Sequence, residues 1–211
     1  MTSPELIPGP AYRIVISHLV IRCPNPSDSS AMDLAIRQNI GPQQPWLLRA
    51  KDEPAGIEQR ITFLRRTRGD FDLGTDFGYL VFDPTETMLL GGTCLSTRLG
   101  MGAREIGYWI NTDQINQGHT TEAAAALTKV AFEIDHVSRV EIQSNPRNTR
   151  SASIPRKLGF IHEATLHDRD LDIDGALRDT MVWTLFEADY PASSASKPEI
   201  HACDTIGRCI L

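Results

Sequence analysis

The feature of this sequence that most clearly indicates a binding site is a glycine turn at the start of an expected helix. Gly118 follows a cluster of turn formers at residues 111–113. The next residues offer a hydroxyl suited to an N-cap and, at Glu122, a carboxylate in the first helical turn. The first N–H groups of a helix have no partner within it and lie at the positive end of the helix dipole. This turn therefore predicts a site for a phosphate or a pyrophosphate.

Two widespread phosphate-binding motifs are missing around this turn. No Gly-Lys-Ser or Gly-Lys-Thr follows it, as a P-loop would require. No Gly-x-Gly-x-x-Gly follows an expected strand either. The sequence therefore disfavours the P-loop and the dinucleotide-binding folds.

The groups that could exchange protons are carboxylates without an evident partner in the sequence. Glu105 begins an expected strand, and Asp170 lies in the acidic stretch of residues 168–175. Such a stretch is usually a solvated loop, although its carboxylates together could hold a cationic substrate. Sequence spacing alone does not choose between these interpretations.

The elements expected to position these residues form a strand, helix, strand, helix series over residues 104–160. Aromatic and β-branched residues indicate a strand at residues 104–110, and residues 139–143 alternate as a second strand. A helix between them carries an apolar stripe at three- and four-residue intervals: Ala123, Leu127, Val130, Ala131 and Ile134. A second helix follows Asn148 and reaches Phe160, and Pro155 within it predicts a kink or a missing hydrogen bond.

The flanking sequence supplies further strands and helices. We expect strands at residues 12–16, 19–23, 77–82, 88–97, 161–167 and 176–185. Helices are expected near residues 32–39 and 54–68, with a loop carrying an aromatic anchor at residues 45–48 between them. The chain is thus predicted to form one domain of the α/β (α+β) class over residues 10–190. Residues 191–211, rich at first in Ser, Ala and Pro, are predicted to be a mobile tail.

Four motifs in this order resemble the GNAT acyltransferases and, within them, the RimJ/RimL-type N-acetyltransferases. They are Glu105-Ile106-Gly107-Tyr108-Trp109-Ile110, Gly118-x-x-Thr121-Glu122-Ala123, Asn148-x-x-Ser151 and Lys157-Leu158-Gly159-Phe160. The resemblance covers residues 19–190 in element order. It implies the GNAT fold, a mixed central sheet of about six to seven strands flanked by about four helices.

The resemblance also implies acetyl-CoA as co-substrate, with another acyl-CoA as the alternative. In such enzymes the strand containing residues 105–110 splays from its neighbour, so that pantetheine pairs with its backbone, and the glycine turn lies near the pyrophosphate. The implied contacts are Tyr108, Trp109, Ile110, Asn116, Gln117, Gly118, His119, Thr120, Asn148 and Ser151. Asn148 has an equally good structural role as a helix N-cap.

Acyl transfer to an amine needs a proton for the leaving thiolate and a place for the developing oxyanion. Ser151 occupies the position of the serine that RimL-like enzymes place beside the coenzyme sulfur. Glu105 and Asp170 are the candidates for the general base. The implied reaction is direct attack of a primary amine, either a protein N-terminus or a small amine, in a ternary complex.

Composition and charge agree with a soluble enzyme that acts on an amine. The formal charge of −6 disfavours a nucleic-acid partner and mildly favours a cationic acceptor. No apolar run is long enough to cross a bilayer, and the first residues do not form a signal peptide, so we expect no membrane contact and a cytoplasmic location. Four cysteines without Cys-x-x-Cys pairing indicate neither a metal site nor a disulfide framework. A homodimer is compatible with the sequence.

A second function class stays open at this point. The turn reads Ile115-Asn116-Gln117-Gly118-His119-Thr120, and only its central glycine matches the usual loop at a defining position. Such a change also fits a GNAT-fold module that binds acyl-CoA or a protein partner without turnover. Backbone N–H donors do not depend on side-chain identity, which keeps the anion site plausible in both cases.

Overall fold

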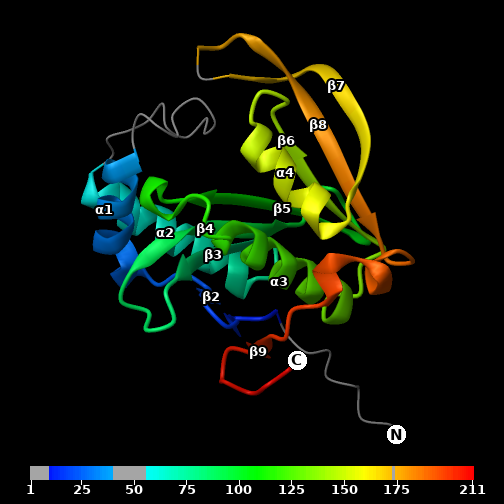
Figure 1. Ribbon diagram of the computed structural model, residues 1–211. Coiled ribbons are helices and arrows are strands. Elements are labelled where there is room, and N and C mark those ends of the chain that lie inside the picture. Colours follow the sequence, from blue (N-terminus) through cyan, green and yellow to red (C-terminus); the bar gives the residue numbers. More distant parts are fainter. Residues whose placement is uncertain (1–9, 40–55, 173) are drawn as a thin grey trace, which may run out of the picture.

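The computed structural model describes residues 10–39, 56–172 and 174–211, and its centre is a mixed sheet of nine strands (Figure 1). In spatial order the strands are β7 (Ile161–Leu171), β8 (Leu177–Phe186), β6 (Arg139–Ser144), β5 (Ala103–Ile110), β4 (Leu89–Ser96), β3 (Phe77–Phe82), β2 (Val20–Arg22), β1 (Arg13–Val15) and β9 (His201–Cys203). Neighbouring strands are antiparallel except β5 and β6, which are parallel. The mixed α+β class is thereby confirmed.

Helices pack on both faces of this sheet. The helices α3 (His119–Glu133) and α4 (Thr149–Leu158) join the larger core, which includes Val140 and Ile142 of β6. The helices α1 (Ser29–Asn39) and α2 (Ile57–Asp72) contribute to a smaller core with alternate residues of β3. Because successive strand residues point to opposite faces, β3 supplies both cores. In Figure 1 the β7–β8 hairpin extends away from the helices.

The parallel pairing of β5 with β6 is short and determines where the cavity forms. It joins residues 103–105 of β5 to residues 139–141 of β6 and then ends. On its other side β5 stays paired with β4 as far as Ile110, and β6 stays paired with β8 as far as Ser144. The two strands therefore separate in the middle of the sheet.

The last segment of the chain does not match the tail that its composition predicts. Residues 201–203 form β9, which pairs with β1 and adds an outer strand. Ala195, Ile200 and Ala202 are buried in the larger core. The small alanine side chains allow close approach to α3 and β1, so a Ser- and Ala-rich segment can dock. The sheet has more strands than expected partly for this reason.

Three further boundaries differ from the sequence-based expectation. The acidic residues up to Leu171 belong to β7 instead of a loop. The helix α2 begins at Ile57 and continues to Asp72, four residues beyond the expected end at Arg68. The expected loop at residues 45–48 lies outside the described residues.

Among the described helices, none is both long and apolar enough to span a membrane.

Candidate active site

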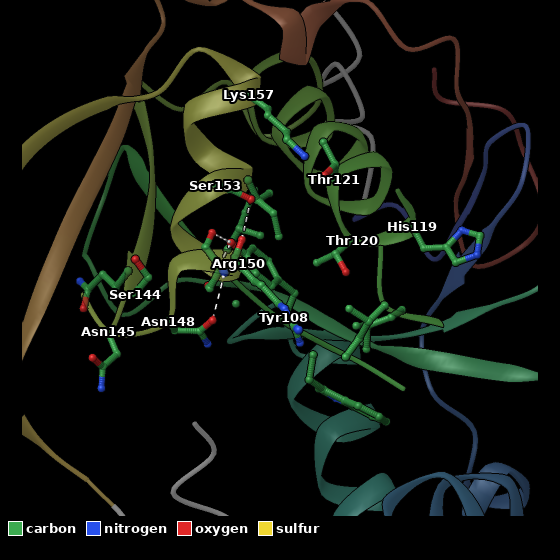
Figure 2. Close-up of a pocket in the computed structure, with 18 of the residues that line it drawn as sticks. Tyr108, His119, Thr120, Thr121, Ser144, Asn145, Asn148, Arg150, Ser153 and Lys157 are labelled. Atoms are coloured by element: carbon green, nitrogen blue, oxygen red, sulfur yellow. Dashed lines mark hydrogen bonds between the residues drawn. The ribbon is translucent and has the colours of Figure 1, made fainter. Parts of the chain in front are cut away.

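A cavity of about 760 Å³ lies where β5 and β6 separate. Its wall includes residues 105–110 of β5, the end of β6, the first turns of α3 and α4, and three residues of the β7–β8 hairpin. Figure 2 shows these elements converging, with Tyr108 close to the N-terminal end of α4. The cavity thus gathers residues that are far apart in the sequence.

The edge of β5 that faces this cavity has no strand partner after Glu105. Backbone groups of a strand alternate between its two edges, so residues 106–110 present N–H and C=O groups toward the gap. An extended ligand with amide groups can pair with such an edge as an added strand would. This is the splay that the family resemblance implies.

The start of α3 has the features of an anion site. Gly118 is the N-cap residue with φ of 91°, in the left-handed region that favours glycine, and no side chain caps the helix. Asn116 also has a positive φ, of 66°. The first N–H groups of α3 are consequently not capped by a side chain, and the helix dipole adds positive potential there.

Most of the predicted co-substrate contacts line the cavity, and one does not. The lining members are Tyr108, Trp109, Ile110, Asn116, Gly118, His119, Thr120, Asn148 and Ser151. Gln117 is the exception: it is exposed, and its Nε2 donates to the carbonyl of Asp113 at 2.9 Å. Its amide stabilises the turn itself, so the structure does not place this side chain in the cavity wall.

Ser151 lies in the first turn of α4 and contacts Tyr108. The Ser151 Oγ donates to the Tyr108 hydroxyl at 3.4 Å, and that hydroxyl donates to the Ser151 carbonyl at 3.1 Å. The Asn148 side chain accepts from the Ser151 N–H at 3.1 Å, which confirms its structural role as the N-cap. Burial raises the pKa of Tyr108 to about 12, outweighing the lowering effect of its hydrogen bond with Ser151. The cavity therefore contains two neutral hydroxyls in contact.

The two candidate general bases are both held by arginines. Both oxygens of Glu105 accept from Arg98, with the Nε contact at 2.6 Å, and the Glu105 side chain is only 10% exposed. Asp170 accepts from Arg178 Nη2 at 2.5 Å and from the Leu171 N–H at 2.8 Å. All four charged side chains belong to residues that line the cavity. Both carboxylates therefore already have an arginine partner within the cavity wall.

The cavity also contains polar residues that the sequence did not single out. The hydroxyl oxygens of Ser144 and Thr180 are buried and have no hydrogen-bond partner among the described residues. Arg150 and Lys157 are exposed and form no ion pair within the described part of the chain. In Figure 2 Lys157 extends from α4 toward Thr121. Lys157 does occur in the quoted motifs, but its spacing gave no sign that it faces α3.

Asn39, the last residue of α1, ties that helix to the end of β5. Its Nδ2 donates to the Asn111 side chain at 2.8 Å, and its Oδ1 accepts from the N–H and the hydroxyl of Thr112. Asn111 in turn donates to the Leu89 carbonyl at 2.7 Å. Asn39 is 6% exposed, so these bonds lie in a largely water-free environment. This network fixes the position from which the Gly118 turn departs.

The residues present fit a coenzyme A thioester. The open edge of β5 suits the amides of pantetheine, and the start of α3 suits a pyrophosphate. Arg150 and Lys157, which have no ion pair among the described residues, suit further phosphate charge. The buried hydroxyls without partners are consistent with a polar ligand in the same space. The alternative of a non-catalytic module was based on the altered side chains of this turn, whereas the anion site depends on backbone N–H groups at the start of α3.

Comparison with known proteins agrees with this geometry. The family described as "Acetyltransferase (GNAT) domain" matches residues 18–161. The chain is 27% identical over 187 residues to the [ribosomal protein uS5]-alanine N-acetyltransferase of Escherichia coli, covering 86% of this chain and 94% of that protein. The structure of Mycobacterium smegmatis RimJ in complex with CoA-disulfide superposes with a TM-score of 0.76 at 21% identity, over 90% of this chain and 94% of that one. The acetyltransferase MccE, solved with acetyl-CoA and AMP, gives a TM-score of 0.73 at 16% identity, over 81% and 93%.

The matched family covers more than half of the chain, including the splayed strands and the whole of α3 and α4. Acetyl-CoA is the co-substrate of this family, and the transferred acetyl group goes to an amine. The chain therefore belongs to the GNAT acetyltransferases, in the branch of the RimJ/RimL-type N-acetyltransferases.

Proposed function

We propose that this acetyltransferase modifies the N-terminal α-amine of a protein. The observation that carries the proposal is a single cavity whose wall contains both paired hydroxyls and paired carboxylates. The cavity wall contains both the paired hydroxyls of Ser151 and Tyr108 and the two carboxylate–arginine pairs, Glu105 with Arg98 and Asp170 with Arg178. The N-acetyltransferase named for ribosomal protein uS5 supports a protein acceptor.

Acetyl-CoA supplies the activated acyl group, a thioester carbonyl on a thiol leaving group. The backbone of residues 106–110 holds the extended part of that molecule, and an N–H from this edge polarises the carbonyl. The backbone N–H groups at the start of α3 bind the pyrophosphate. These contacts leave the thioester sulfur beside α4.

The acceptor amine attacks the carbonyl carbon directly, so no enzyme nucleophile is required. Glu105 and Asp170 surround the incoming amine, and their arginines keep the acceptor side nearly charge-balanced. Either carboxylate accepts the amine proton through water once the acceptor displaces its arginine. When the carbon–sulfur bond breaks, the sulfur leaves with the electron pair, and the Ser151 Oγ–H supplies the proton to it.

A peptide panel tests the acceptor class. The protein and acetyl-CoA are incubated with peptides that carry a free α-amine, with the same peptides blocked at the α-amine but containing lysine, and with small amines. Thiol release and a mass increase confined to the free α-amine peptides are expected. Acetylation of lysine or of small amines with no α-amine product would refute the proposed acceptor while leaving the acetyltransferase activity in place.

A further inference from the structure

The helix α4 contains a proline four residues after Ser151. In an α-helix the N–H of residue 155 would donate to the carbonyl of residue 151. Position 155 is Pro155, which has no N–H, and it is buried within α4. The Ser151 carbonyl thus lacks the donor that the helix normally supplies.

The Tyr108 hydroxyl donates to that carbonyl. Its proton goes to the Ser151 carbonyl at 3.1 Å, and its oxygen accepts from the Ser151 Oγ at 3.4 Å. Tyr108 comes from β5, so the bond crosses between two elements and closes a small ring of contacts around Ser151. A carbonyl that already accepted a helical N–H would be a weaker anchor for the phenol.

We propose that Pro155 is a positioning residue, which acts by leaving the Ser151 carbonyl free to hold Tyr108, and that Tyr108 in turn orients the Ser151 hydroxyl. This inference rests on the proposed role of Ser151. As the carbon–sulfur bond breaks, Ser151 gives its proton to the sulfur. Ser151 then regains a proton from solvent, which balances the proton that the acceptor amine releases.

The substitution Pro155→Ala separates this role from a structural one, because the two effects have opposite signs. Alanine restores the helical N–H, removes the ring clash and favours the helix, so Tm is expected to stay level or to rise by about 2–8 °C. The restored N–H competes for the Ser151 carbonyl and releases Tyr108, so kcat is expected to fall roughly tenfold with little change in KM for acetyl-CoA. Arg156→Ala, one residue along α4, is the matched control and is expected to retain kcat.

The combination with Tyr108→Phe decides whether Pro155 acts through the phenol. In the Tyr108→Phe background, Pro155→Ala is expected to have no further effect on kcat. Full kcat in Pro155→Ala would overturn the inference. An equal loss of kcat with and without the Tyr108 hydroxyl would also overturn it, because the proline would then act by another route. Neither result bears on whether the protein acetylates an amine, which the wild-type assay measures separately.

A second site, independent of the proposed acceptor, lies in the C-terminal hairpin. Cys203 of β9 and Cys209 face each other across an antiparallel bridge. The flanking backbone bonds run from the Asp204 N–H to the Arg208 carbonyl and from the Ile210 N–H to the Ala202 carbonyl. The cysteines therefore form a non-hydrogen-bonded pair, in which Cα atoms are about 4.5 Å apart and side chains share a face. That separation lies within the range of disulfides.

We propose that Cys203 and Cys209 are a site of reversible disulfide formation with a small disulfide such as oxidised glutathione. The exposed Cys209 thiolate attacks one sulfur of glutathione disulfide and releases one glutathione. The Cys203 thiolate then attacks the Cys209 sulfur and releases the second. Two protein thiols lose two electrons and two protons, which convert one glutathione disulfide into two thiols. The bond closes the hairpin that holds β9 beside β1.

Tryptic mapping of the full chain tests this site, because Arg208 lies between the two cysteines. After treatment with glutathione disulfide and digestion without reductant, residues 209–211 are expected to stay attached to the peptide that ends at Arg208. Tm is expected to rise by about 4–8 °C, reversibly with dithiothreitol. Cys203→Ser should abolish both effects, and Cys94→Ser should not. A stable glutathione adduct on Cys209, or a link from Cys209 to another cysteine, would overturn the proposal.

Discussion

Replacement of Ser151 by alanine separates its chemical role from its place in α4. The N-cap bond of α4 goes from the Ser151 backbone N–H to Asn148, so it survives the substitution. Alanine also has a better helix propensity than serine. The side-chain bond that is lost, from Ser151 Oγ to Tyr108, measures 3.4 Å and is a long one. A stability loss of at most about 1 kcal/mol is therefore expected.

The expected loss of activity is larger than this structural cost. A positioned proton donor contributes roughly 10²- to 10⁴-fold, and each tenfold corresponds to about 1.4 kcal/mol of transition-state stabilisation. Tyr108 lies beside the vacated position and could donate in place of the lost hydroxyl. We therefore expect kcat of Ser151→Ala to fall about ten- to thousandfold, with acetyl-CoA affinity nearly unchanged because the backbone contacts of β5 and α3 persist.

The assay is thiol release at saturating acetyl-CoA with an acceptor identified in the peptide panel, together with calorimetric affinity for acetyl-CoA. Ser153→Ala is a suitable control, since its hydroxyl donates to the Arg150 carbonyl on the same helix. Ser151→Cys keeps a proton at a different length and pKa and should retain partial activity. Wild-type kcat in Ser151→Ala would refute the assignment of Ser151 as proton donor. Either Tyr108 would then protonate the thiolate, or the thiolate would leave without a proton donor.

Four further outcomes follow from the structure. Gly118→Val should weaken acetyl-CoA binding at least about tenfold in calorimetry. The control is Gly74→Val, at another glycine with a positive φ, of 69°, and open space around it. This control should lower stability without affecting the affinity for acetyl-CoA. Deletion of residues 192–211 should lower Tm by about 5–15 °C, because it exposes buried core side chains; an unchanged Tm would mean that the segment does not dock. Asn39→Ala should raise the acetyl-CoA Kd roughly three- to tenfold through the Gly118 turn, and unaltered Kd would show that the turn does not depend on it. Burial disfavours ionisation of Asp204, but hydrogen bonds from Arg208 and two backbone N–H groups hold its pKa below the ordinary value. The stabilisation that the ionised Asp204 provides is therefore present above about pH 4 and is lost as the pH falls through the lowered pKa. Asp204→Asn should reduce this acid dependence of Tm.

Local sequence patterns were sufficient to predict the elements around the site. The apolar stripe of α3, the glycine before it and the Asn148 cap of α4 are each set by residues a few positions apart. The start of the anion site could therefore be found from sequence. The sequence also predicted that Pro155 would remove a hydrogen bond from α4, but it did not predict that the Tyr108 hydroxyl would bond to the Ser151 carbonyl.

The remaining features depend on contacts between distant segments. The pairing of β9 with β1 joins residues almost 190 positions apart in sequence, and no local period marks it. The Tyr108 bond to Ser151 spans 43 positions, and the ion pair between Asp170 and Arg178 depends on the register of the β7–β8 hairpin. Gln117 was predicted as a ligand contact from its place in the turn, and local spacing did not show that its side chain would bond to the Asp113 carbonyl. Such contacts are fixed by tertiary packing, which residue types alone do not determine.

The central claim is that the open edge of β5 and the start of α3 bind the co-substrate in the gap of the sheet. Hydrogen–deuterium exchange with and without acetyl-CoA tests it most directly, because it reports on the backbone N–H groups themselves. The account predicts slower exchange at residues 106–110 and 118–121 when acetyl-CoA is present, with β1 and β9 unchanged. Protection elsewhere on the protein, with exchange at both of these segments unaltered, would contradict it.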